Sequence, residues 1–171
     1  MSLPEWLVLA ILSQQPMHGF AVAQLTVADG ELGRVWQIPK AVIYRAIGRL
    51  LDAELVVPQS TEQGLGPQRT IYAATPEGSE AARRWLHTPV EHVRDIRSHL
   101  LLKLAVLDRI GGDSADLLCS QRAVLELIAA AIEDQLAQSG GFDATLLAWR
   151  RATAVAALDF LDTITERADA H

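Results

Sequence analysis

Two short β-prone runs around a glycine-containing loop constrain the fold of this chain more than any other feature. The runs are residues 55–60 and 69–75, and the loop between them contains Gly64, Gly66 and Pro67. Glycine and proline favour a turn over a strand interior, so the two runs predict a β-hairpin. Because helical patterns stand on both sides, the chain is predicted to be mainly α-helical with one small hairpin.

Three helical segments are predicted before the hairpin. Residues 4–12 are apolar on nearly every side, as a short buried helix needs, and Pro16 and Gly19 then interrupt the pattern. Apolar residues recur at intervals of three and four between residues 21 and 28, which is the period of a second helix. After another break, Pro39 suits the first turn of a third helix.

A fourth helix is predicted directly after the hairpin. Thr75 is suited to its N-cap and Pro76 to its first helical position. The order of three helices, a hairpin and a helix, with a break between the second and third helices, describes a winged helix-turn-helix. In that fold the third helix enters the major groove of DNA, while the hairpin, called the wing, lies along the DNA backbone.

The predicted third helix is amphipathic and has a cationic outer face. Its apolar positions form one stripe, and Arg45 and Arg49, four residues apart, project from the other side. Lys40 lies in the first turn, where a long side chain still reaches solvent. Residues 32–51 carry four cations and no anion. Taken alone, a helix of this kind is more often a solvated surface than a binding surface. The helices before it and the hairpin after it favour a DNA-binding surface instead.

Arginine suits this surface because its planar fork donates two hydrogen bonds to a guanine edge or pairs with phosphate oxygens. We expect Arg45 and Arg49 to reach the groove and Lys40 to contact phosphate. Arg69 extends the same positive surface along the hairpin. Tyr44, at the border of the apolar stripe, is equally consistent with a DNA contact and with a partly buried spacer. These five residues are the predicted DNA-binding residues.

The net charge of −6 is concentrated in the second half of the chain. Residues 1–90 carry seven Lys and Arg against eight Asp and Glu, a net of −1, whereas residues 91–171 carry eight against thirteen, a net of −5. A partner senses the local field more than the total charge. The acidic sum therefore does not exclude DNA binding by the first half.

Two long helices are predicted in the second half. Apolar residues recur at helical spacing within residues 116–136 and 144–164, and the sequence SGGF at residues 139–142 separates the two patterns. A helical pair this rich in Ala and Leu needs a surface to cover its apolar faces, so we expect a homodimer. The chain is thus divided into a winged helix-turn-helix DNA-binding domain, residues 1–88, and a C-terminal helical dimerisation region, residues 89–171.

Three short motifs stand at a spacing typical of one known family. They are a Pro-x-His-Gly-aromatic turn, a tyrosine-containing helix with a leucine-rich end, and a Gly-Pro-x-Arg wing, matched here by Pro16, His18, Gly19, Phe20, Tyr44, Leu50, Gly66, Pro67, Arg69 and Tyr72. With these motifs, residues 3–86 resemble the PadR family of bacterial transcriptional regulators. Thr70 stands where that family usually has a lysine, and Glu54 replaces a customary glycine. We expect weaker wing binding from the first difference and no change of fold from the second.

The resemblance implies a regulator that commonly acts as a repressor. It implies dimerisation through the C-terminal helices, binding to double-stranded DNA at a palindromic operator, and release when a small aromatic or drug-like effector binds. Trp85 and Trp149 are candidate effector platforms, although a buried place at a helix interface is the favoured interpretation of both.

The sequence carries no motif of a catalytic, metal or cofactor site. His87, His92 and His99 lack a zinc-binding spacing, and no nucleophile elbow, phosphate loop or dinucleotide fingerprint is present. We therefore expect no enzyme, no metal and no cofactor. Cys119 is the single cysteine, and no apolar run reaches the length of a membrane span, so we expect a cytoplasmic protein without membrane contact.

The alternative function is a winged-helix module that binds another protein rather than DNA. Salt separates the two functions, because contacts to phosphate lose affinity steeply as salt rises. A protein-binding module predicts a partner affinity that is almost independent of salt once Arg45 and Arg49 are neutralised.

Overall fold

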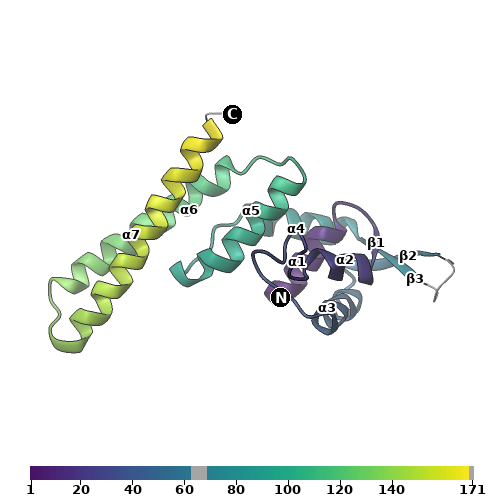
Figure 1. Ribbon diagram of the computed structural model, residues 1–171, viewed down its shortest axis with the longest axis horizontal. Coiled ribbons are helices and arrows are strands. Elements are labelled where there is room, and N and C mark those ends of the chain that lie inside the picture. The colour runs from purple at the N-terminus through teal and green to yellow at the C-terminus, as the bar shows by residue number, and fades with distance from the viewer. Residues whose placement is uncertain (63–68, 170–171) are drawn as a thin grey trace. The chain divides into compact units, whose positions relative to one another are not determined.

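The computed structural model describes residues 1–62 and 69–169 and is mainly helical with one small antiparallel sheet (Figure 1). The predicted fold class is confirmed. The chain divides into two compact units: an N-terminal unit of Met1–His87 with Leu101–Gly112, and a C-terminal unit of Thr88–Leu100 with the chain from Asp113 onward. Within the described residues, none of the helices combines the length and the apolarity that crossing a membrane requires.

The N-terminal unit contains the winged helix-turn-helix that the sequence predicts. In chain order its elements are α1 (Leu3–Leu12), β1 (Met17–His18), α2 (Gly19–Leu25), α3 (Lys40–Asp52), β2 (Val56–Glu62), β3 (Arg69–Ala74), α4 (Pro76–His87) and α5 (Leu101–Arg109). The order of three helices, a hairpin and a helix is confirmed. Pro39 is the N-cap of α3, one position before the helical turn in which it was expected.

The sheet has one strand more than the predicted hairpin. Its strand order is β1-β3-β2, and both pairings are antiparallel. Met17 and His18, which the sequence placed in a break between helices, pair with Tyr72 and Ile71 of β3. The register of β2 against β3 shifts after Pro58, as expected of a residue that cannot donate to the ladder. The predicted wing turn at Gly66 and Pro67 lies outside the described residues.

The helices pack around α1, which is buried on nearly all sides as predicted. α3 and α4 both contact α1. Thr75 caps α4, because its hydroxyl accepts a hydrogen bond from the Gly78 amide at 3.0 Å. A Cβ atom on Gly78 would lie 2.1 Å from the carbonyl oxygen of Leu55, so this position requires glycine. The predicted start of α4 is confirmed.

The C-terminal end of α3 shows the effect of having Glu54 where the family usually has glycine. Glu54 has a φ of 56°, in the left-handed region that favours glycine, and the Leu55 amide donates to the Leu50 carbonyl at 3.0 Å. This is a helix-terminating turn built without its usual residue, at a cost of about 1 kcal/mol for the side chain. As expected, the fold is unchanged.

α5 lies beyond residue 88, where the sequence suggested a boundary, yet it packs in the N-terminal unit against α1 and α4. The Nζ atom of its Lys103 lies 5.0 Å from the ring centroid of Trp85. Trp85 is buried and stacks on Trp6 with a centroid separation of 5.9 Å. The compact unit therefore differs from residues 1–88 by this helix. The assignment of DNA binding to residues 1–88 and dimerisation to residues 89–171 stays a prediction.

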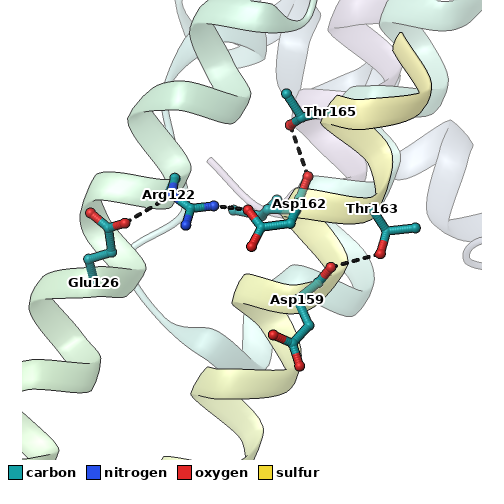
Figure 2. A network of polar contacts seen from close by, with 7 residues as sticks. Arg122, Glu126, Asp159, Asp162, Thr163 and Thr165 are labelled. Carbon is teal, nitrogen blue, oxygen red and sulfur yellow. Dashed lines mark hydrogen bonds and ion pairs between the residues drawn. The ribbon is translucent and has the colours of Figure 1, made fainter. Parts of the chain in front are cut away.

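The C-terminal unit is dominated by the predicted helical pair, α6 (Ala115–Leu136) and α7 (Gly141–Asp169), which lie side by side (Figure 1). Two short helical segments precede them, Val93–Asp95 and Ile96–Leu100. Arg122 of α6 donates to Glu126 of the same helix at 2.9 Å and also to Asp162 of α7, which Figure 2 shows. This ion pair joins the two helices at the surface.

Candidate nucleic-acid interface

α3 presents the cationic outer face that its sequence predicts. The side chains of its other face are buried, namely Ile43, Ala46, Ile47 and Leu50. On the outer face Lys40, Arg45 and Arg49 are exposed, and Tyr44 is 45% exposed. The first turn of the helix holds no acid, and Arg49 stands in the last turn, where a cation interacts favourably with the carbonyl end of the helix.

The beginning of α2 fixes the position of Tyr44. The His18 side chain caps α2, because its Nδ1 atom accepts a hydrogen bond from the Ala21 amide at 2.9 Å. The next residue, Gly19, faces α3 so closely that a Cβ atom would lie 3.0 Å from both the Tyr44 ring and the Ile47 side chain. The histidine and glycine of the turn motif thus hold the second helix against the third.

Two of the five predicted DNA-binding residues, Lys40 and Arg69, lie against Phe20, an exposed side chain at the start of α2, and a third, Tyr44, lies beside Lys40. The Nζ atom of Lys40 lies 4.9 Å from the Phe20 ring centroid and 5.8 Å from that of Tyr44. The Cζ atom of Arg69, on β3, lies 5.5 Å from the Phe20 centroid. We call these four residues, Phe20, Lys40, Tyr44 and Arg69, the Phe20 cluster.

Cation–π attraction within the Phe20 cluster restrains two long side chains at the surface. The guanidinium of Arg69 also lies 3.3 Å from the Nε2 atom of His18. Among the side chains that the structure describes, those of residues 1–61 and 69–167, neither cation has an acidic partner within ion-pair distance. Two positive charges from α3 and β3 are therefore held on one surface with their hydrogen-bond donors available to an anion.

The other two predicted residues, Arg45 and Arg49, lie beside the beginning of α1. They line a hollow of about 140 Å³ together with Ser2, Pro4, Glu5, Val42 and Ala46. An Nη1 nitrogen of Arg49 lies 2.8 Å from Oε1 of Glu5. Hydrogen bonds from Arg49 and from the Ser2 amide hold the pKa of the Glu5 carboxyl below its usual value. Arg49 is thus already ion-paired within the chain, and its contact with DNA stays a prediction.

Sequence reasoning missed Phe20 and Glu5 as members of this surface. Phe20 was visible only as the aromatic residue of the turn motif, and nothing in its spacing shows that Arg69 reaches it from β3. Glu5 carried a clearer signal, because Ser2 and Glu5 have the spacing of a capping box before an apolar helix. That box predicts a fixed carboxylate at the start of α1, although it does not predict the partner on α3.

A second candidate surface is a groove of about 730 Å³ in the C-terminal unit. Its walls are mostly apolar and include Ile128, Ile132 and Phe160, and the cationic side chains Arg94, Arg97 and Arg150 also line it. Trp149 lines this groove and is 68% exposed, so the predicted burial of Trp149 is wrong, whereas that of Trp85 is confirmed. The sequence of α7 did not reveal that Trp149 is exposed. Apolar residues extend over more of the surface of α7 than α6 covers, so the pattern does not show which of them are buried.

Metal-binding side chains do not gather in the part of the chain that the structure describes: no three of His, Cys, Asp and Glu there are placed to hold an ion. Residues 8–84 match the model of the family described as Transcriptional regulator PadR-like family. The likeness to the PadR-like family therefore covers 77 of the 171 residues, namely the winged helix-turn-helix. The PadR-like match begins inside α1 and ends inside α4, so it includes the Phe20 cluster, Arg45 and Arg49, and it begins after Glu5.

Several solved structures are similar to this chain. Bacillus subtilis PadR in complex with operator DNA is 18% identical, and the likeness covers 96% of this chain and 98% of that chain with a TM-score of 0.47. The complex of Bacillus subtilis PadR with p-coumaric acid is 17% identical over 96% and 98% of the two chains, with a TM-score of 0.43. The protein smu.1604c from Streptococcus mutans UA159 is 15% identical over 97% and 99%, with a TM-score of 0.46. No curated protein matches the chain.

Proposed function

We propose that this PadR-like protein is a cytoplasmic, sequence-specific DNA-binding regulator that represses transcription as a homodimer on a palindromic operator. A small aromatic or drug-like molecule releases it from the DNA. The observation that carries the proposal is the surface on which α3 and β3 present Lys40, Arg45 and Arg69 to solvent. Catalysis has no part in it.

This surface is suited to the major groove and its flanking phosphates. Arg45 is exposed on the outer face of α3, and we expect its planar fork to read a base edge. Lys40 at the start of α3 and Arg69 on the wing strand are restrained by Phe20 and serve as phosphate contacts. Tyr44 supports Lys40 and stays exposed at the same surface. Phosphate contacts fix the register of the protein, and the base contact supplies the specificity.

The homodimer is supported by the apolar side chains that α7 leaves exposed. Phe142, Leu146 and Trp149 follow one another at intervals of four and three residues, so they share one face of the helix, and all three are exposed. An apolar face of this kind is typical of a surface that another protein covers. A two-fold axis brings two copies of α3 to successive major grooves, about 34 Å apart, which is why the proposed operator is palindromic.

The groove in the C-terminal unit supports the effector. Its volume of about 730 Å³ is suited to a small molecule, its apolar walls to an aromatic ring, and its arginines to a carboxylate. Trp149 belongs both to this groove and to the exposed face of α7. A ligand in the groove therefore changes the surface through which we expect the two copies to associate. p-Coumaric acid, the ligand in the Bacillus subtilis PadR complex, has the required ring and carboxylate and is the first molecule to test.

The test is fluorescence anisotropy of the full chain against a labelled duplex from the region upstream of its own gene, with a scrambled duplex of the same composition as reference. Both titrations are repeated over a series of salt concentrations. We expect tighter binding to the upstream duplex and a steep loss of affinity as salt rises. p-Coumaric acid and other aromatic carboxylates are then added to the complex, and release of the upstream duplex is the expected result.

A matched pair of variants separates this surface from general charge effects. Lys40→Gln with Arg45→Gln removes two cations from α3, and Arg83→Gln with Arg84→Gln removes two cations from α4 of the same unit. We expect only the first pair to abolish the preference for the upstream duplex. Equal losses from both pairs, or no DNA binding at any salt concentration, contradict the proposal and favour the protein-binding module.

A further inference from the structure

The ion pair between Glu5 and Arg49 places a carboxylate on a surface that is otherwise cationic. The Glu5 side chain is 10% exposed and that of Arg49 is 69% exposed, so the acid lies beneath the guanidinium and the guanidinium covers it. Glu5 stands in the first turn of α1 and Arg49 in the last turn of α3. The contact therefore connects two helices that are far apart in the sequence.

Both oxygens of the Glu5 carboxylate have hydrogen-bond donors. Oε2 accepts from the Ser2 amide at 2.8 Å, and Oε1 accepts from Arg49 at 2.8 Å. The Ser2 contact is one half of the capping box of α1, so the carboxylate is held by the backbone of a buried helix. Its direction is thus fixed independently of Arg49, and it acts as a rigid acceptor for the guanidinium.

This arrangement changes what Arg49 offers to a polyanion. A guanidinium has five N–H donors, and Glu5 accepts from one nitrogen, so exposed donors remain for an oriented contact. Its charge, however, is compensated by a fixed negative charge 2.8 Å away. By contrast, Arg45 lines the same hollow and has no acidic partner within ion-pair distance among the described side chains, those of residues 1–61 and 69–167. The two arginines of α3 are electrostatically different.

We propose that Glu5 is a specificity-determining residue for DNA binding: it orients the guanidinium of Arg49 for one contact in the operator and cancels its attraction to phosphate in any other sequence. The inference rests on the proposed function. Sequence-independent binding depends on the number of uncompensated cations near the DNA backbone. Glu5 lowers that number without removing the donors of Arg49, so it raises the ratio of specific to non-specific affinity.

The test is Glu5→Gln in the full chain, with the upstream and scrambled duplexes. Glutamine keeps one acceptor oxygen, which serves the Ser2 amide and preserves that half of the capping box, whereas its NH2 group cannot accept from Arg49, so the charge and the ion pair are removed together. We expect affinity for the scrambled duplex to rise about threefold or more, and the slope of log affinity against log salt on that duplex to steepen by about 0.9. Affinity for the upstream duplex rises less, so the ratio of the two falls.

Two controls assign the effect to the pair. Glu77→Gln removes the same charge from α4 and should leave the ratio unchanged. In an Arg49→Gln background, Glu5→Gln should leave the ratio unchanged, because no guanidinium is left to orient and the removed carboxylate repels both duplexes alike. Arg49→Gln alone should weaken binding to the upstream duplex by about fivefold or more and binding to the scrambled duplex by less, because it removes an operator contact and leaves the Glu5 charge uncompensated near both duplexes. This variant tests the inference even where Glu5→Gln does not fold.

The outcomes also separate this inference from the proposed function. If the wild-type chain binds both duplexes equally, the proposed function fails and this inference fails with it. If the wild-type chain prefers the upstream duplex and Glu5→Gln keeps the same ratio as Glu77→Gln, only this inference is overturned. A fall in the ratio that persists in the Arg49→Gln background also overturns it, because Glu5 then acts through something other than Arg49.

Discussion

α3 and α7 distribute their apolar and charged side chains in opposite ways. The apolar stripe of α3 is buried inside its own unit, and its outer face carries cations. α7 buries one stripe against its own unit but leaves large apolar side chains exposed on another face, namely Phe142, Leu146 and Trp149. Each helix therefore presents a surface that the single chain does not cover, and the two surfaces differ in chemistry.

The difference indicates what each surface is suited to bind. A cationic face loses little by contact with water and gains by contact with a polyanion, so α3 is stable both with and without DNA. Exposed aromatic side chains gain free energy when another apolar surface removes them from water. We therefore expect substitutions in the stripe of α3 to act on folding, and substitutions in the exposed face of α7 to act on association.

The largest effect is expected from Ile43→Ala in the buried stripe of α3. Ile43 is fully buried, so truncation leaves a cavity and should lower the free energy of unfolding by about 2–5 kcal/mol. The matched change is Leu127→Ala on α6, where the leucine is 74% exposed and the expected loss is about 0.5 kcal/mol or less. Denaturant unfolding of both variants measures the difference. Equal losses would show that the exposed leucine is covered in the folded protein.

A charge on the exposed face of α7 should separate the two copies of the proposed homodimer. Phe142 is 77% exposed, so Phe142→Asp leaves each unit folded, and it should weaken the dimer by about 2 kcal/mol or more if the ring lies in the interface. Sedimentation over a range of protein concentrations measures the shift. Ala148→Asp places the same charge on another exposed side of α7 and is expected to leave the association unchanged. A dimer that is insensitive to Phe142→Asp excludes this face as the contact.

The two surfaces were not equally readable from the sequence. On α3 the apolar residues recur every three or four positions in a narrow stripe, and the other face is charged. The sequence therefore predicted which face is buried and which is exposed. On α7, Ala and Leu occupy so much of the helix that the pattern gives the helix but not the covered side, and the expected burial of Trp149 was wrong. The strand at Met17 and His18 was missed because two residues carry no period, and only the partner β3 makes them a strand. Clusters such as that of Phe20 depend on contacts between distant segments, which no local pattern contains.

The next largest effect, on the pH dependence of stability, is expected from Lys103, which is buried whereas the cations of α3 are exposed. It is 3% exposed, and burial lowers its pKa from 10.5 to about 8. The unfolded chain binds the proton more tightly than the folded chain, so the free energy of unfolding should rise as the pH increases from about 8 toward 10.5. Lys103→Met should flatten this rise and stabilise the protein at neutral pH by about 1–3 kcal/mol.

Thermal unfolding at several pH values measures the effect of Lys103, and Lys40→Met, at an exposed cation, serves as the control. Lys40→Met should keep the rise in stability above pH 8. A lower stability of Lys103→Met at neutral pH would contradict the prediction. It would mean that the contacts of the ammonium, including that with the Trp85 ring at 5.0 Å, outweigh the cost of burying its charge.

The smallest effect on folding, and the sharpest on DNA, is expected from Arg45→Ala on the outer face of α3. Its side chain is exposed, so the free energy of unfolding should change by about 0.5 kcal/mol or less. If Arg45 reads a base, its loss should weaken operator binding by about 1–3 kcal/mol and relax the preference at one base pair in each half-site.

Lys40→Ala is the comparison, because a phosphate contact should lower the affinity for all duplexes alike and reduce the salt slope by about 0.9. Titration of both variants against a set of single-base operator changes distinguishes the two roles. If Arg45→Ala also weakens all duplexes equally, the outer face of α3 attracts DNA without reading it, and specificity has to come from Arg49 or from the wing.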